Sequence, residues 1–114
     1  MRYLPMIYTN EPGLGDAPSA GAELIAEYAT FTEEMVRRGV IRGGDRLRPT
    51  WAATTVQVRD GDVMISDGPF AEAKQQIGGY CLIECTDLDE ALEVAARIPH
   101  ARQGTIEVRP IWET

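Results

Sequence analysis

The chain has 114 residues and a mass of 12.6 kDa, the size of a single domain. Its 11 Lys and Arg against 18 Asp and Glu give a formal net charge of −7 and a pI of about 4.6. This acidity argues against nucleic-acid binding, because affinity for phosphates rests on Lys and Arg. No apolar run approaches the ~20 residues of a membrane span, and the apolar stretch after Met1 is too short for a signal peptide. We therefore expect one cytoplasmic domain over residues 1–114, with no nucleic-acid or membrane partner.

The two cysteines, Cys81 and Cys85, lie four positions apart in one predicted strand. At ~3.3 Å per residue their Cα atoms would be ~13 Å apart, too far for a disulfide. The spacing is not that of a Cys-x-x-Cys pair and the chain has one His, which argues against a zinc site. We expect two buried thiols that pack as small hydrophobic groups.

The predicted elements alternate between strands and helices along the chain. In order they are a strand over residues 2–9, a loop over 10–19, a helix over 20–38, an interrupted strand over 40–47, strands over 52–59 and 62–66, a short helical stretch over 71–76, a strand over 78–85, a helix between Asp87 and Pro99, and a strand over 104–111. The strand over 2–9 contains Pro5, which cannot donate to a ladder and indicates an edge, a bulge or a strand side with no partner.

Both predicted helices carry terminal signals. Ser19 suits the N-cap of the first helix and Gly39 the residue after its end. Asp87 suits the N-cap of the second, with Glu90 three residues on as in a capping box. Apolar residues recur at helical spacing in both helices, at Leu24, Tyr28, Phe31 and Met35 in the first and at Leu88, Leu92, Ala95 and Ile98 in the second.

The element order predicts an α+β fold, a ferredoxin-like plait with an inserted β-hairpin turning at Asp60-Gly61. Both helices would then cover one face of an antiparallel sheet. Strand alternation points six apolar residues toward the helices, namely Val56, Val58, Cys81, Ile83, Ile106 and Val108. The other face would carry Tyr80, Leu82 and Glu84, and two interpretations of it remain open. It faces water, or it stacks on a second copy to form a dimeric α/β barrel.

One stretch resembles a known family. Asp67-Gly68-Pro69-Phe70-Ala71-Glu72-Ala73-Lys74, followed by Ile77-Gly78-Gly79-Tyr80, is similar to the DGPF-motif branch of the YCII-related domain family. The resemblance extends over nearly the whole chain and implies the ferredoxin-like plait and a homodimer of the dimeric α/β-barrel type. Most members have no assigned activity, some relatives are linked to dechlorination of hydroxyquinone-type aromatics, and many in this branch are encoded beside sigma factors.

The wider family pairs a His of the first helix with an acid just after the first strand. Here the His position falls on Tyr28 and the acid position near Asn10 or Glu11. A mechanism that depends on an imidazole at that helix position therefore does not carry over to this chain.

Asp67 is the first candidate for a catalytic group, with Glu84 and Tyr28 beside it. Each has a structural alternative. The Asp67 carboxylate could cap the following turn, and Tyr28 lies on the apolar helix face, where core packing is common. Glu84 could pair with Arg109 on a neighbouring strand, or Arg109 could grip an anionic substrate.

Four further residues are candidate ligand contacts near the end of the first strand and in the turn, namely Tyr8, Asn10, Pro69 and Phe70. His100, which follows Pro99, is interpreted as a surface residue near a helix end. With no other imidazole in the chain, a haem or metal protein is disfavoured, and we expect no cofactor.

Two functions of different classes follow. The first is a homodimer that binds a small aromatic or anionic ligand and acts as a cofactor-independent proton-transfer or elimination enzyme of the lyase or dehydrochlorinase type. The alternative is a non-catalytic regulatory or interaction module associated with a sigma factor or a stress response. A deep pocket holding a desolvated carboxylate would favour the enzyme.

Overall fold

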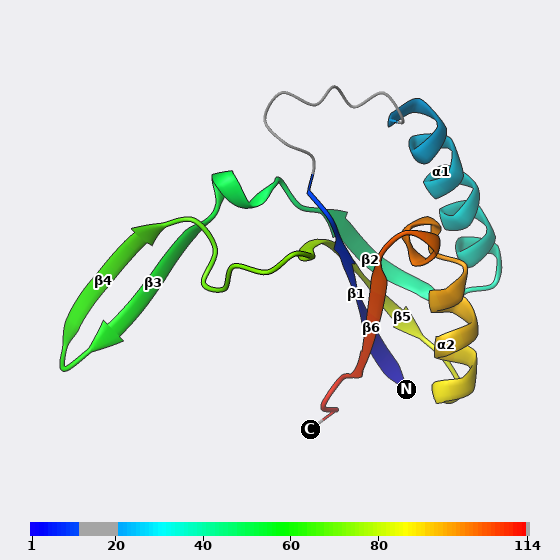
Figure 1. Ribbon diagram of the computed structural model, residues 1–114. Coiled ribbons are helices and arrows are strands. Elements are labelled where there is room, and N and C mark those ends of the chain that lie inside the picture. Colours follow the sequence, from blue (N-terminus) through cyan, green and yellow to red (C-terminus); the bar gives the residue numbers. More distant parts are fainter. Residues whose placement is uncertain (12–20, 114) are drawn as a thin grey trace.

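The computed structural model describes residues 1–11 and 21–113 (Figure 1). Its elements are β1 (Arg2–Thr9), α1 (Gly21–Arg37), β2 (Ile41–Arg46), the 3-10 helix η1 (Thr50–Ala52), β3 (Thr54–Arg59), β4 (Asp62–Asp67), β5 (Gln76–Glu84), α2 (Leu88–Ala96), the 3-10 helix η2 (Pro99–Arg102) and β6 (Thr105–Pro110). The predicted N-cap Ser19 lies outside the described residues.

Four strands form one antiparallel sheet in the order β2-β5-β1-β6. With the hairpin of β3 and β4 set aside, the chain order is strand, helix, strand, strand, helix, strand. Figure 1 shows α1 and α2 together on one face of this sheet. The predicted α+β fold, a ferredoxin-like plait with an inserted hairpin, is confirmed. We call the sheet face opposite the helices the open face.

The central strand of this sheet contains Pro5, which is buried. β1 pairs with β5 on either side of it, at Tyr3 and Met6, and with β6 at Pro5 itself. Of the three alternatives for Pro5, an edge strand is therefore wrong, whereas a strand side with no partner agrees with the missing pair toward β5. Proline has no backbone N–H, so a strand tolerates it at a position where no neighbouring carbonyl needs that donor.

α1 ends as its sequence predicts. Gly39 adopts a φ of +71°, and its amide donates to the Val36 carbonyl at 3.0 Å. The amide of Val40 donates to the Met35 carbonyl at 3.1 Å, which completes a Schellman motif. The turn drives Val40 into the core and directs the chain into β2.

α2 begins at the predicted cap. The Asp87 carboxylate accepts a hydrogen bond from the Glu90 amide at 2.9 Å. The Glu90 carboxylate in turn accepts from the amide and hydroxyl of Thr86, at 2.8 and 3.0 Å, one residue before the cap. Two backbone amides and one hydroxyl at the helix start are satisfied in this way.

The buried face of α2 differs from the predicted stripe. Leu88 and Leu92 are 47% and 48% exposed. The face that meets the sheet consists of Ala91, Val94, Ala95 and, just after the helix, Ile98. The prediction favours the two leucines because they are large and apolar. The structure instead buries the small Ala91 and Ala95, which let the helix backbone approach the sheet closely.

The core lies between the two helices and the sheet. It includes the predicted residues Phe31, Met35 and Ile83, and the partly buried Ile106 and Val108 pack against it. Cys81 and Cys85 are also core residues, both buried and both free thiols, as expected. Burial is the main reason that the pKa of Cys81 is raised to about 11, which keeps it a thiol at neutral pH.

β3 and β4 form a separate two-stranded sheet that projects from the main body (Figure 1). The predicted turn is confirmed, since Asp60 and Gly61 have φ values of +51° and +82°. The expected inward orientation of Val56 and Val58 is wrong, because they are 61% and 59% exposed. Alternation shows that a strand has two unlike faces, but it does not show which body covers the apolar one.

The expected short helix over residues 71–76 is also absent from this described segment. The Gln76 side-chain amide donates to the carbonyls of Ala71 and Ala73, at 3.0 and 3.3 Å. This side chain satisfies carbonyl groups that a helix would satisfy with its own backbone amides, so the segment stays irregular.

Candidate functional site

One edge of the main sheet gathers the ends of all four strands. β1 and β2 run in the same direction and end there, at Thr9 and Arg46, while β5 and β6 begin there, at Gln76 and Thr105. The hairpin also leaves and rejoins the body at this edge. We call it the site edge, because its loops place polar side chains from distant parts of the sequence together.

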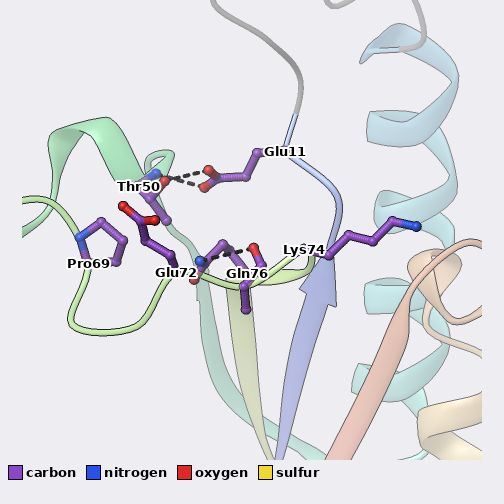
Figure 2. Close-up of a pocket in the computed structure, with 7 residues that line it drawn as sticks. Glu11, Thr50, Pro69, Glu72, Lys74 and Gln76 are labelled. Atoms are coloured by element: carbon purple, nitrogen blue, oxygen red, sulfur yellow. Dashed lines mark hydrogen bonds between the residues drawn. The ribbon is translucent and has the colours of Figure 1, made fainter.

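An open pocket of about 320 Å³ lies at the site edge (Figure 2). Its lining comes from the loop after β1, from η1 and from the segment that joins the hairpin to β5, and consists of Glu11, Thr50, Pro69, Glu72, Ala73, Lys74 and Gln76. Most of these side chains are polar, so the pocket suits a small polar ligand better than an apolar one.

Glu11 and Thr50 fix one wall of this pocket. The Thr50 amide donates to Glu11 Oε1 at 2.7 Å, and the Thr50 hydroxyl donates to Oε2 at 2.5 Å. Both carboxylate oxygens are therefore occupied, as Figure 2 shows. These charge-assisted bonds tie the loop after β1 to the start of the hairpin.

The opposite wall is the segment after the Asp-Gly-Pro-Phe turn. The Gln76 side chain holds this segment through its hydrogen bonds to the carbonyls of Ala71 and Ala73. Gln75 accepts a 2.9 Å hydrogen bond from the Thr105 hydroxyl of β6. Lys74 extends from this segment toward α1 (Figure 2). The wall thus carries a cationic side chain on a backbone that is anchored to two strands.

On the helix side of the sheet, Tyr28 of α1 meets His100 of η2. The Tyr28 hydroxyl lies 2.6 Å from His100 Nδ1, and the ring centroids are 5.5 Å apart. Both residues are half-buried. The positive charge of Arg46, the last residue of β2, acts on the pKa of both residues. The pair therefore lies near the site edge.

The surroundings hold both members of the pair in their neutral forms. Burial raises the pKa of Tyr28 to about 12. Burial, and then the positive charge of Arg46, lower the pKa of His100 below its ordinary value, against a smaller opposite effect of Glu27. At neutral pH this arrangement provides an uncharged imidazole, which can accept a proton, hydrogen-bonded to an uncharged phenol.

The predicted turn residues lie at the base of the hairpin. Asp67 ends β4 and is exposed, and Phe70 is 81% exposed, whereas Pro69 lines the pocket. The turn is held by Gly68, whose amide donates to the Ala53 carbonyl at 2.8 Å and whose carbonyl accepts from the Thr55 hydroxyl at 2.7 Å.

Glu84 and Arg109 lie toward the other end of the sheet. Glu84 is 3.6 Å from the N-terminal amine, and Arg109 contacts Glu107 at 2.5 Å. The expectation that Glu84 and Arg109 lie on neighbouring strands is wrong, because β1 lies between β5 and β6. The structure therefore separates Glu84 from Tyr28 and Asp67.

Of the remaining predicted residues, Tyr8 is half-exposed near the end of β1 and Asn10 is exposed just beyond it, both at the site edge. Sequence reasoning did not select Thr50, Lys74 and Gln76, and it interpreted His100 as a surface residue. The available signals were that Lys74 belongs to the family-like motif and that His100 is the single histidine of the chain.

Among residues 1–11 and 21–113, no three His, Cys, Asp or Glu side chains gather into a group that could hold a metal ion. Of the helices in the described part of the chain, none combines the length and apolar character needed to cross a membrane.

Comparison with known proteins gives two findings. The family model of the YCII-related domain matches residues 1–114. An uncharacterised protein of Rhizobium meliloti (strain 1021) is 38% identical over 90 residues, which cover 77% of this chain and 73% of that protein.

Proposed function

This chain belongs to the YCII-related domain family, and we propose that it is a homodimer that binds a small anionic or hydroxylated aromatic ligand at the site edge. We further propose that it catalyses proton transfer or elimination on that ligand without a cofactor. His100 is the base, Tyr28 positions its imidazole, and Lys74 and Arg46 supply the positive charge that attracts the ligand.

The observation that carries this proposal is the 2.6 Å contact between Tyr28 Oη and His100 Nδ1 in a half-buried setting. When Nδ1–H of the neutral imidazole donates to the Tyr28 oxygen, the other nitrogen, Nε2, carries no proton and can accept one.

The chemistry follows from this arrangement. Nε2 of His100 removes a proton from a carbon next to a carbonyl group of the ligand, and the electron pair of that C–H bond forms an enolate. The proton then returns at another position, which is an isomerisation. Alternatively the electron pair expels an anionic leaving group such as halide, which is an elimination. Tyr28 holds the imidazole and stabilises it when it is protonated.

The cations of the site are the groups that would hold an anionic ligand. Two acids, Glu11 and Glu72, also line the pocket, and the Glu11 carboxylate is already occupied by two hydrogen bonds from Thr50. Lys74 and Arg46 add two cations at the same edge of the sheet. A carboxylate or phenolate would find hydrogen-bond donors here.

A single NMR signal tests ligand binding, because the chain has one histidine. We expect 4-hydroxybenzoate, or another acid from a panel of hydroxylated benzoates, to shift the imidazole Cε1–H resonance in a saturable way. Tyr28→Phe should weaken that binding by about tenfold, or ~1.4 kcal/mol. Tyr80→Phe is the matched control, because it removes a phenol that donates to Asp45 instead, at 2.8 Å. If no acid of the panel moves the resonance, the binding site is wrongly placed.

Proton transfer has its own test. Wild-type protein should accelerate deuterium incorporation into the methyl group of pyruvate in D2O, and His100→Gln should not. Equal rates for the two proteins, with ligand binding intact, would remove the catalytic part of the proposal and leave a binding protein.

A second candidate function is the non-catalytic interaction module, which the projecting hairpin favours. For such a module, wild-type protein and His100→Gln should exchange pyruvate protons at the same rate, whether or not the acids bind.

A further inference from the structure

The hairpin of β3 and β4, which we call the arm, has two unlike faces. Val56 lies opposite Ile65 and Val58 opposite Val63, so four β-branched side chains share one face. The other face carries the pairs Thr55–Ser66, Gln57–Met64 and Arg59–Asp62. The first set, which we call the arm face, is as apolar as the buried side of a core strand.

The arm face is nevertheless exposed within one chain. Its members are exposed by 59–69%, namely Val56, Val58, Val63 and Ile65. A two-stranded hairpin alone is marginally stable in water, and it needs further strands or a packed surface to persist. An extended arm with this face therefore requires a second body to cover it.

The dimensions of the chain show how far it departs from a compact domain. The radius of gyration is 16.1 Å, whereas a compact domain of this length has about 13 Å. The accessible surface is 8130 Å², whereas a compact monomer of this mass exposes about 6,200 Å². The chain thus exposes roughly 1,900 Å² more than a compact monomer would, which leaves enough surface for the interface of a homodimer.

The direction of the arm indicates where the second body lies. Figure 1 shows the arm projecting from the site edge on the side opposite to α1 and α2, which is the side of the open face. That face carries half-buried apolar side chains, which alternate with core residues along β1 and β5, namely Leu4, Met6, Tyr80 and Leu82. A body stacked on the open face would lie beneath the arm.

We propose that the arm is a clasp that buries Val56, Val58, Val63 and Ile65 against a second copy of this chain stacked on the open face. This inference rests on the homodimer of the proposed function and adds the element that holds it together. A two-fold axis makes the contact reciprocal, so that each subunit both provides an arm and receives one. The arm leaves the body between Thr50 and Pro69, two residues of the pocket lining, so the clasp also fixes one side of the site.

Neighbouring residues of β4 give a matched test by analytical ultracentrifugation. Ile65→Asp places a charge on the arm face, and Met64→Asp places the same charge one residue away on the opposite face, where Met64 is 52% exposed. We expect Ile65→Asp to raise the dimer dissociation constant by about 100-fold or more. Met64→Asp should leave the constant within about threefold of the wild-type value.

Hydrogen exchange gives a second readout that needs no variant. In the wild-type dimer the amides of β3 and β4 should be protected, and their protection should fall on dilution into the monomer range. If the wild-type protein is a dimer and both variants dimerise equally well, the clasp is wrong while the homodimer stands. If the wild-type protein is a monomer with unprotected arm amides, the homodimer itself fails.

Discussion

The hydroxyl of Tyr28 and Nδ1 of His100 lie 2.6 Å apart although the two residues are 72 positions apart in the sequence. α1 supplies the phenol, and η2, the short turn that follows α2, supplies the imidazole. The contact joins two helical segments on the same face of the sheet, so the only histidine of the chain reports on the candidate site.

The first prediction concerns the charge on His100. Its pKa should lie below the ordinary histidine value of ~6.5, because the ring is partly desolvated and faces Arg46. Arg46→Gln should raise this pKa, because it removes the neighbouring positive charge. An NMR titration of the imidazole measures both values. Arg48→Gln is the control, since Arg48 is not among the groups that act on His100, and an equal shift in this variant would contradict the assignment.

The second prediction follows from the sign of that shift. Because the unfolded chain takes up the proton at a higher pH, neutral His100 contributes stability above pH ~6.5, which is lost as the pH falls from there through the folded pKa. Urea unfolding at a series of pH values should show this loss in the wild-type protein. It should be smaller in His100→Gln, and parallel pH curves for the two proteins would be the contrary result.

The third prediction concerns Gly104, which precedes β6. A Cβ atom at this position would lie 2.1 Å from the Tyr8 carbonyl oxygen, so the backbones of the two strands could not keep their spacing. Gly104→Ala should lower the free energy of unfolding by about 2 kcal/mol or more. Gly43→Ala, where a Cβ meets nothing within 4 Å, should change it by less than about 0.5 kcal/mol. Similar losses in both variants would show that close approach is not the cause.

The fourth prediction concerns the start of α2. Asp87→Ala removes the acceptor of the Glu90 amide and should destabilise the fold by about 1 kcal/mol. Asp89→Ala, in the same first turn, removes only a favourable charge near the helix start and should cost about 0.5 kcal/mol or less. Chemical denaturation of the two variants compares these effects directly.

The fifth prediction separates two adjacent residues of α1. Met35 is fully buried, whereas Val36 is 59% exposed. Met35→Ala should leave a cavity and cost about 2–5 kcal/mol. Val36→Ala should stay within about 0.5 kcal/mol of the wild type. The difference between their urea midpoints measures how firmly α1 is packed on the sheet, and a small difference would mean that the core is loosely packed there.

The sequence by itself determined the elements that depend on local chemistry. Asp87 caps α2, Gly39 ends α1, and Asp60-Gly61 turns the hairpin, because capping and turn geometry are decided by a few adjacent residues. The order of these elements was then enough for the ferredoxin-like plait, since few topologies connect them without crossing.

The tertiary structure alone decided which distant residues meet. His100 joins Tyr28, and Glu11 joins Thr50, through contacts between elements that no local pattern relates. It also decided that Val56 and its neighbours leave the core. Alternation fixes that a strand has an apolar face, but the body that covers the face depends on the path of the whole chain and, for the arm, on the second copy that we propose.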